Sequence, residues 1–183
     1  MSLLSFLEKI DLECNEIADN VMNKKALRLD GKGKNGLRGQ LGLGDQNCCD
    51  YLLPKDNKLI LIEISDFIKQ LQKLQTKYKE VPKDCKSLVQ DAQKIMRREV
   101  KLKVLSSLIV LFKLPVAFQI AHETIHKKQL EIIFVVCSNK PEDVLEFEYL
   151  TTEISGALNP LIRKVKIVDI SMFQHELTRI RHR

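Results

Sequence analysis

An almost unbroken apolar segment, residues 59–64, constrains the fold of this chain more than any other feature. Successive side chains of a strand point to opposite faces, so a strand of this kind must be covered on both sides. Residues 47–53 precede it and are also rich in strand formers, and the intervening residues 54–57 have turn chemistry. The sequence therefore predicts a β-hairpin whose second arm lies at the centre of a sheet with helices packed on it.

The remaining periodicities place further elements around this hairpin. We predict helices over 3–22, 67–81, 87–112, 141–158 and 172–183, and strands over 116–126, 130–138 and 164–171. Pro115 is expected to end the third of these helices, and the strands on either side of residues 127–129 to form a second hairpin. This order predicts a single α/β domain over residues 1–183, with a mixed central β-sheet flanked by helices.

The composition excludes several classes of protein. Hydrophobic residues make up 44% of the chain and charged residues 30%, which is typical of a globular domain and not of a disordered one. No apolar segment approaches the roughly 20 residues that span a bilayer, so no membrane partner is expected. The first residues lack the basic start of a secretory signal, which predicts a cytoplasmic location. The odd count of five cysteines, with Cys48 and Cys49 adjacent, is typical of reduced thiols and not of a disulfide framework.

One carboxylate, Glu63, interrupts the apolar segment. A buried carboxylate must be paired, protonated or bound to a cation, because an isolated buried charge is too costly. Pairing across a turn at 54–57 places Glu63 within a few residues of Asp50, at one end of the hairpin. Two clustered acids that are open to water form an oxygen-ligand site for Mg²⁺ or Mn²⁺. The alternative is a structural ion pair between Glu63 and a neighbouring lysine or arginine, with Asp50 capping a turn.

These acids and their spacing resemble the motif of the PD-(D/E)xK nuclease superfamily. Asp50 is followed by twelve residues and then by an apolar strand that ends in Glu63, Ile64 and Ser65. The family places an Asp near the start of one strand and an acid-x-Lys on the next. The resemblance covers roughly residues 3–138, and it implies a restriction-endonuclease-like core that hydrolyses DNA with the help of a divalent metal.

The motif lysine of that family falls on Ser65, which carries no positive charge. Some members carry this lysine on the following helix instead, so the resemblance points to Lys69 as the third catalytic residue, with Lys73 one turn further. Many members also direct an acid from the first helix to the metal. That resemblance gives this role to Glu16, or to Glu13 as the alternative.

A glycine-rich basic stretch precedes the hairpin. Six of the seven glycines fall within residues 31–44, together with Lys32, Lys34 and Arg38. Flexible backbone that carries positive charge can approach phosphates closely, so these three side chains are predicted to contact DNA. A mobile surface loop with solubilising lysines is the alternative. The net charge of +6 is compatible with a polyanionic partner, so DNA is the expected partner, and a homodimer is the assembly that we consider.

Two other functions compete with a nuclease. Ser65 favours a catalytically inactive module that keeps the nuclease fold and binds nucleic acid or protein. His122, Glu123 and His126 match HExxH, and Glu146 lies twenty residues further, which is the ligand set of a thermolysin-like zinc peptidase. That motif works on a helix, whereas the apolar alternation here predicts a strand, in which the two histidines would lie roughly 13 Å apart. The zinc peptidase is therefore the least favoured of the three.

Overall fold

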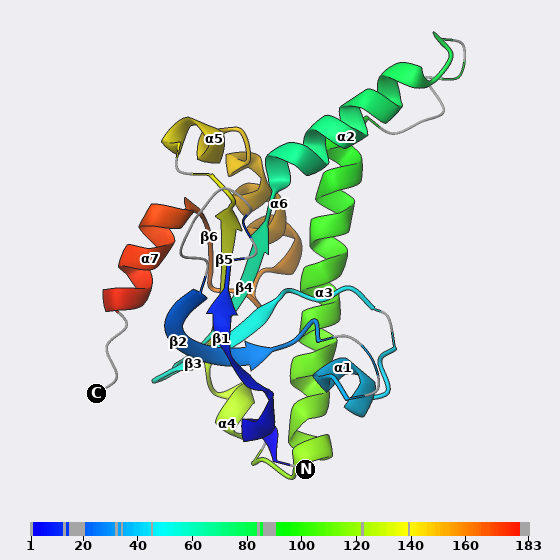
Figure 1. Ribbon diagram of the computed structural model, residues 1–183. Helices are drawn as coiled ribbons and strands as arrows, with labels where there is room; N and C mark the ends of the chain where they lie inside the picture. The colour runs from blue at the N-terminus through cyan, green and yellow to red at the C-terminus, as the bar shows by residue number, and fades with distance from the viewer. Residues whose placement is uncertain are drawn as a thin grey trace.

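The computed structural model describes residues 2–12, 14, 21–31, 33, 35–44, 46–83, 85, 91–121, 123–138 and 140–179 (Figure 1). The first half of this part contains η1 (Leu3–Phe6), β1 (Leu7–Asp11), β2 (Val21–Arg28), α1 (Leu37–Gln40), β3 (Tyr51–Lys55), β4 (Lys58–Ser65) and α2 (Phe67–Glu80). The second half contains α3 (Ala92–Phe118), α4 (Glu123–His126), β5 (Gln129–Val136), α5 (Pro141–Leu145), α6 (Glu148–Leu158), β6 (Lys164–Asp169) and α7 (Ile170–Arg179).

The six strands form one mixed sheet in which spatial order follows chain order. Neighbours from β1 to β4 are antiparallel, and β4, β5 and β6 are parallel. Strand β4 therefore lies inside the sheet, with β3 on one side and β5 on the other. The predicted class, an α/β fold with a helix-flanked mixed sheet and β4 as an inner strand, is confirmed.

Helices cover both faces of this sheet. On one face, side chains of α2, α3 and α6 join the inward residues of β4 and β5 in a single core that contains Leu61 and Phe134. On the other face, Phe173 and Leu177 of α7 pack with the alternate strand residues, among them Ile62. Figure 1 shows α3 and α7 on different sides of the strands. Within the described ranges, no helix combines the length and apolarity needed to cross a bilayer.

The predicted helix over 3–22 is wrong wherever the structure describes this segment. Residues 3–6 form a single 3₁₀ turn, and residues 7–11 and 21–28 are antiparallel strands. Ile10, Leu12 and Cys14 are all buried and alternate along the chain, which is the period of a strand. The apolar residues fit both periods, and pairing with a distant segment decides between them.

The first arm of the predicted second hairpin is also wrong. Helix α3 continues through Pro115 to Phe118, and the single turn of α4 follows. Pro115 lies in the last turn of α3, so its missing N–H removes only one hydrogen bond of the helix. Gln119 ends the helix in the left-handed region, at φ 52°. The second arm is confirmed as β5, and the predicted helix over 141–158 is divided into α5 and α6.

A disulfide bond joins Cys14 to Cys137, which are 123 residues apart in the chain. The expectation of reduced thiols is therefore wrong for these two residues, whereas Cys48, Cys49 and Cys85 are free. The bond ties the segment after β1 to the end of β5. The sequence gives no sign of this pairing because it depends on how distant strands are arranged.

Candidate active site

The hairpin of β3 and β4 places two acids opposite each other. Its turn consists of the two residues Asp56 and Asn57, whereas the sequence predicted a four-residue turn at 54–57. Asp56 has a φ of 43°, the left-handed conformation that two-residue hairpin turns use. Tyr51 pairs with Ile62, so continuing this register by one residue sets Asp50 against Glu63. The two acids therefore share one end of the hairpin, as the sequence suggested.

The carboxylate of Glu63 is buried under α3, with 1% of the side chain exposed. It lies on the same face of β4 as Leu59 and Leu61, because alternate residues of a strand point the same way. Its Oε1 accepts a hydrogen bond from Nζ of Lys103 on α3. Its Oε2 is buried and has no hydrogen-bond partner among the described residues. One oxygen of Glu63 is thus paired with a cation and the other is unsatisfied.

Helix α3 directs Lys103 toward the sheet. Val100, Val104 and Ser107 are buried and recur at the spacing of one helix face, and Lys103 belongs to that face. The Ser107 hydroxyl accepts a hydrogen bond from the backbone N–H of Cys49 at 2.8 Å and thereby holds the residue before Asp50 against α3. The Lys103 side chain retains 28% of its exposure, so water reaches the lysine side of the ion pair.

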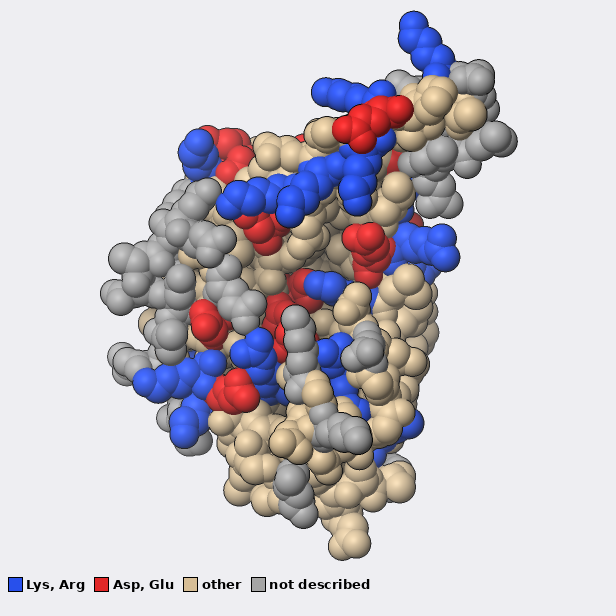
Figure 2. All heavy atoms as spheres, turned by 45° about the vertical axis from the view of Figure 1, so that its right-hand side comes forward, with Lys and Arg blue, Asp and Glu red and all other residues tan. Residues whose placement is uncertain are grey.

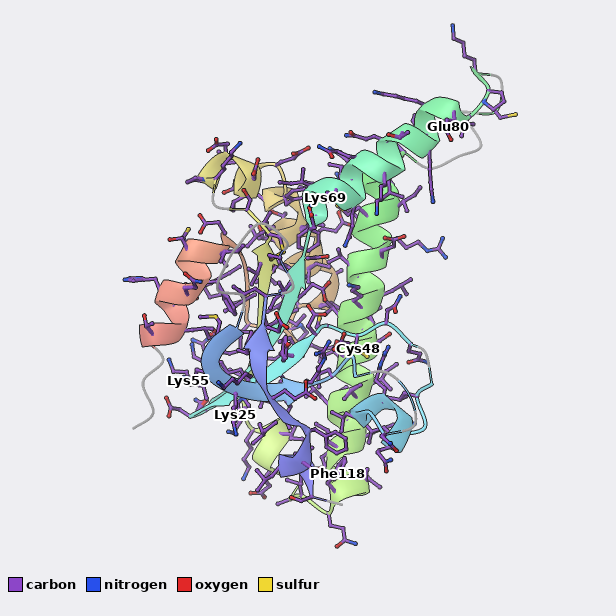
Figure 3. All side chains as sticks on the ribbon, viewed as in Figure 1. Lys25, Cys48, Lys55, Lys69, Glu80 and Phe118 are labelled. Atoms are coloured by element: carbon purple, nitrogen blue, oxygen red, sulfur yellow. A yellow bond between two sulfur atoms is a disulfide. The ribbon has the colours of Figure 1, made fainter. Side chains whose placement is uncertain are left out.

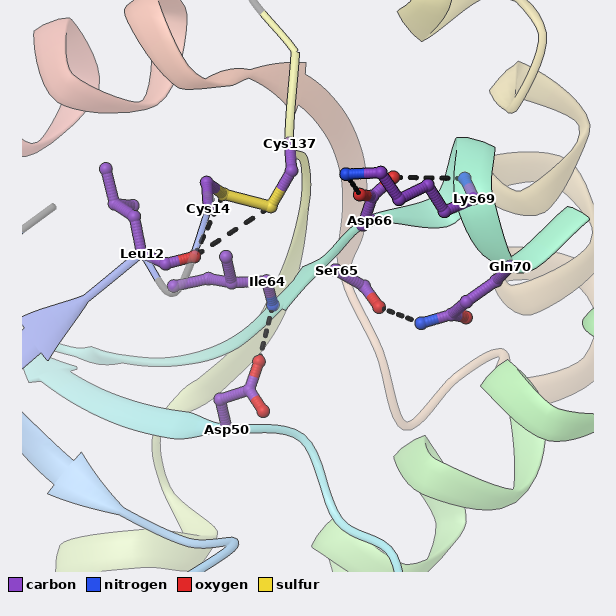
Figure 4. The surroundings of a disulfide bond; sticks show 9 residues. All are labelled: Leu12, Cys14, Asp50, Ile64, Ser65, Asp66, Lys69, Gln70 and Cys137. Carbon is purple, nitrogen blue, oxygen red and sulfur yellow. Dashed lines mark hydrogen bonds and ion pairs between the residues drawn. A yellow bond between two sulfur atoms is a disulfide. The ribbon is translucent and has the colours of Figure 1, made fainter. Parts of the chain in front are cut away.

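Asp50 is held by the backbone of the neighbouring strand. Its Oδ2 accepts a hydrogen bond from the N–H of Ile64, at 2.6 Å (Figure 4). Burial raises the pKa of Asp50 well above its usual range, and the nearby charge of Glu63 raises it further. The Ile64 hydrogen bond and the Lys103 charge oppose this rise. Glu63 is therefore close enough for its charge to act on Asp50.

The ion pair of Glu63 and Lys103 shifts the pKa of both side chains, together with burial. Burial raises the pKa of Glu63 to about 7, although the positive charge and hydrogen bond of Lys103 act in the opposite direction. Burial lowers the pKa of Lys103, but the Glu63 carboxylate outweighs this effect, so the lysine pKa is raised overall.

A third acid, Asp30, follows β2 on the edge of this site. Its negative charge raises the pKa of both Asp50 and Glu63. Its Oδ1 accepts a hydrogen bond from Nε of Arg28 at 3.0 Å. No group of three or more His, Cys, Asp or Glu side chains in the described part of the chain is arranged to hold a metal ion. The candidate site is therefore the pair of acids with Lys103.

Lys69 and Ser65 lie beside this site, at the start of α2. Lys69 is at the base of that helix (Figure 3), and its half-exposed side chain places Nζ 2.8 Å from Oδ2 of Asp66. The Ser65 hydroxyl accepts a hydrogen bond from Nε2 of Gln70 at 2.5 Å (Figure 4). The cation on Glu63 comes from Lys103, in the middle of α3, and not from the first turn of α2.

The sequence did not reveal Lys103, because the apolar residues around it do not all face the core. Leu102, the residue before it, is 51% exposed. The buried face instead follows Val100, Val104 and Ser107. The signal that could have identified Lys103 is a charged residue at the spacing of this buried face. Glu63 is the corresponding charged residue in the apolar strand β4.

The glycine-rich basic stretch is only partly described. Four predicted residues lie outside the described residues: Glu13, Glu16, Lys32 and Lys34. Arg38 is 6% exposed, and its guanidinium donates to the carbonyls of Asp30, at 2.6 Å, and of Gln46. The Arg38 side chain therefore points into its own loop, where its hydrogen bonds connect Asp30, before the glycine-rich stretch, with Gln46, after it.

In the described part of the chain, Glu146 lies far from the HExxH match. Residues 123–126 form α4 and precede β5, whereas Glu146 follows α5 beyond the other end of that strand. Eight residues of β5 separate the two positions, which corresponds to roughly 23 Å. A zinc ion needs ligand atoms at about 2 Å, so Glu146 cannot complete a site with residues of α4. His122 lies outside the described residues.

Comparisons with protein-family models, with curated proteins and with solved structures give no match. The chemistry of the site must therefore be judged on its own residues. Mg²⁺ usually keeps several waters and takes one or two carboxylates from a protein. At this site Glu63 has one oxygen without a hydrogen-bond partner among the described residues, close to the Asp50 carboxylate.

Proposed function

We propose that the protein is a metal-dependent nuclease that hydrolyses DNA phosphodiester bonds at Asp50, Glu63 and Lys103. The observation that carries the proposal is the buried carboxylate of Glu63, which has one oxygen on Lys103 and one without a partner. A second carboxylate lies opposite it. Placing two acids side by side in a buried strand pair opposes folding, and strongly perturbed groups of this kind are concentrated at functional sites.

The surrounding elements support the same proposal. The antiparallel pair β3 and β4 carries the acids, and α2 and α3 then connect β4 to the parallel strand β5. We equate these elements with a restriction-endonuclease-like core. The N-terminal helix of that core has no counterpart over the described residues of 3–22, where β1 and β2 extend the sheet instead.

Each residue has a distinct role in this proposal. Asp50 and Glu63 would hold Mg²⁺ or Mn²⁺, which on binding would polarise the phosphodiester and lower the pKa of an attacking water. Lys103 supplies the positive charge that Ser65 lacks, and its ammonium would stabilise the charge that develops on the phosphate oxygens. Lys69, at the start of α2, stays a second candidate for this role.

Cleavage assays on plasmid and linear duplex DNA test this proposal. Asp50→Asn and Lys103→Met should each reduce the Mg²⁺-dependent rate by at least about 10²-fold while the thermal transition stays cooperative. Lys101→Met makes the same substitution two residues away on α3, and should leave the rate within twofold. Undiminished cleavage by both site variants would overturn the assignment.

The second candidate is a binding module without catalysis. The ion pair itself favours it, because Lys103 already neutralises Glu63 where a metal would act. Salt-sensitive DNA binding with no cleavage in Mg²⁺ or Mn²⁺ would support this second function. Robust metal-dependent turnover would exclude it.

A further inference from the structure

Helix α2 forms an arm that leaves the sheet beside the candidate site. Its N-cap, Asp66, directly follows β4. From Lys69 at its base to Glu80 at its end, the helix points away from the strands (Figures 1 and 3). Its 14 residues rise about 20 Å, and only Phe67 and Leu71 are buried. The outer turns of α2 therefore stand clear of the core.

Three of the arm's four lysines lie on one side. Lys69, Lys73 and Lys77 recur every four residues, which places them on the same face of the helix. The residues that pack on the core lie on the opposite side: Phe67, Ile68, Leu71 and Leu74. The helix holds four lysines and a single acid, Glu80. Figure 2 shows blue side chains gathered along this arm.

Of the three lysines in this stripe, only Lys77, in the last turn of α2, is placed to stabilise the carboxyl end of the helix. Like charges four residues apart on a helix repel each other and destabilise it. Lys69 pairs with Asp66 at the base, but Lys73 and Lys77 form no salt bridge with any residue that the structure describes. Their positive charge is therefore available to a partner.

The surface of the arm limits what that partner is. Proteins that hold single strands stack bases on exposed aromatic rings, but Phe67 is buried and Tyr78 is half-buried. A helix that lies in a membrane surface exposes large apolar side chains, and none of those exposed in the described ranges belongs to α2. Point charges about 6 Å apart along the helix suit the phosphate backbone of a duplex.

We propose that α2 is a docking arm for the phosphate backbone of double-stranded nucleic acid, held by Lys73 and Lys77 and by Lys69 at the base. The inference rests on the proposed function, because the arm starts where β4 ends and would lead the bound strand toward Asp50 and Glu63. It adds to that function the surface that holds the substrate, which differs from the glycine-rich stretch predicted from the sequence.

The test measures binding of the full chain to a fluorescent 24-base-pair duplex over a range of salt concentrations, with EDTA present so that no cleavage occurs. Lys73→Gln combined with Lys77→Gln should weaken binding about tenfold and reduce the slope of log affinity against log salt by about 1.8. Lys73→Arg with Lys77→Arg should restore both. The matched control, Lys25→Gln with Lys55→Gln, removes two lysines away from the arm (Figure 3) and should retain the wild-type slope.

Several outcomes would contradict the proposed role of α2 and leave the proposed active site unaffected. These are an unchanged slope in the arm variant, an equal loss in the control, tighter binding of a single strand, or preference for phosphatidylserine vesicles. Asp50→Asn should still bind the duplex, so lost cleavage with intact binding concerns the catalytic residues alone. Metal-dependent hydrolysis of a small phosphodiester such as bis(p-nitrophenyl) phosphate, without duplex binding, would reject the arm and keep the nuclease chemistry.

Discussion

Two lysine–glutamate pairs lie at opposite ends of β4, and they differ in what surrounds them. At one end, Glu63 pairs with Lys103, and the exposed fractions of their side chains are 1% and 28%. At the other end, Lys58 pairs with Glu131 at 2.5 Å, with exposed fractions of 42% and 13%. The residue types are the same, but only the first pair contains a carboxyl that is fully removed from water.

This difference explains why one pair is a candidate site and the other is not. An ion pair open to solvent contributes little, because water screens both charges. A buried carboxylate loses its hydration and depends on its partner, and burial raises the pKa of Glu63 to about 7. Its second oxygen also lacks a hydrogen bond among the described residues. The buried pair therefore contains the oxygen that the proposed metal site would use.

Removal of each glutamate should produce the largest contrast between the pairs. Glu63→Gln removes a metal ligand and should lower the Mg²⁺-dependent cleavage rate by about 10³-fold, since such an ion is worth several kcal/mol. Glu131→Gln makes the same change in the exposed pair and should leave the rate within twofold. Equal effects on cleavage would show that burial does not distinguish the two pairs.

Removal of each lysine should separate their contributions to stability. Lys103→Met leaves Glu63 buried beside no cation, and urea unfolding at pH 8 should show a loss of about 3 kcal/mol. Lys58→Met removes a cation that is 42% exposed, and should cost about 0.5 kcal/mol because water already screens that charge. A loss at Lys103 no greater than that at Lys58 would contradict the account of a desolvated pair.

A change of pH should give the smallest effect, with a definite sign. The pKa of Glu63 in the folded protein lies above its ordinary 4.5. Its contribution to stability is therefore fully present below pH 4.5 and is lost as the pH rises through about 7. Without Lys103 the pKa rises further, so Lys103→Met should lose roughly 1 kcal/mol more than wild type between pH 6 and pH 8. The stability of Lys58→Met should change with pH as that of wild type does, and a reversed trend in Lys103→Met would refute this assignment.

The sequence predicted the parts of this molecule that depend on near neighbours. The hairpin, the inner strand β4, the strand β5 and the helix α2 follow from local periodicity and turn chemistry, and Glu63 was visible as an anomaly in an apolar segment. Asp50 was expected near Glu63 because a hairpin register is local, although the turn differs from the expected one.

The parts that were missed depend on contacts across the chain. Lys103 lies forty residues from Glu63, and its position required the correct face of α3. The strands β1 and β2 replace a predicted helix because they pair with each other and with β3. The Cys14–Cys137 disulfide joins segments that no local pattern relates.

The most direct test of the central claim is anomalous diffraction from crystals of the full chain soaked in Mn²⁺. The account predicts one peak between the carboxylates of Asp50 and Glu63, at the roughly 2 Å oxygen distances typical of a small divalent ion. A soaked crystal of Glu63→Gln should lose that peak. No peak in wild type, with Lys103 still paired to Glu63, would contradict the metal site and leave the pair as a structural element.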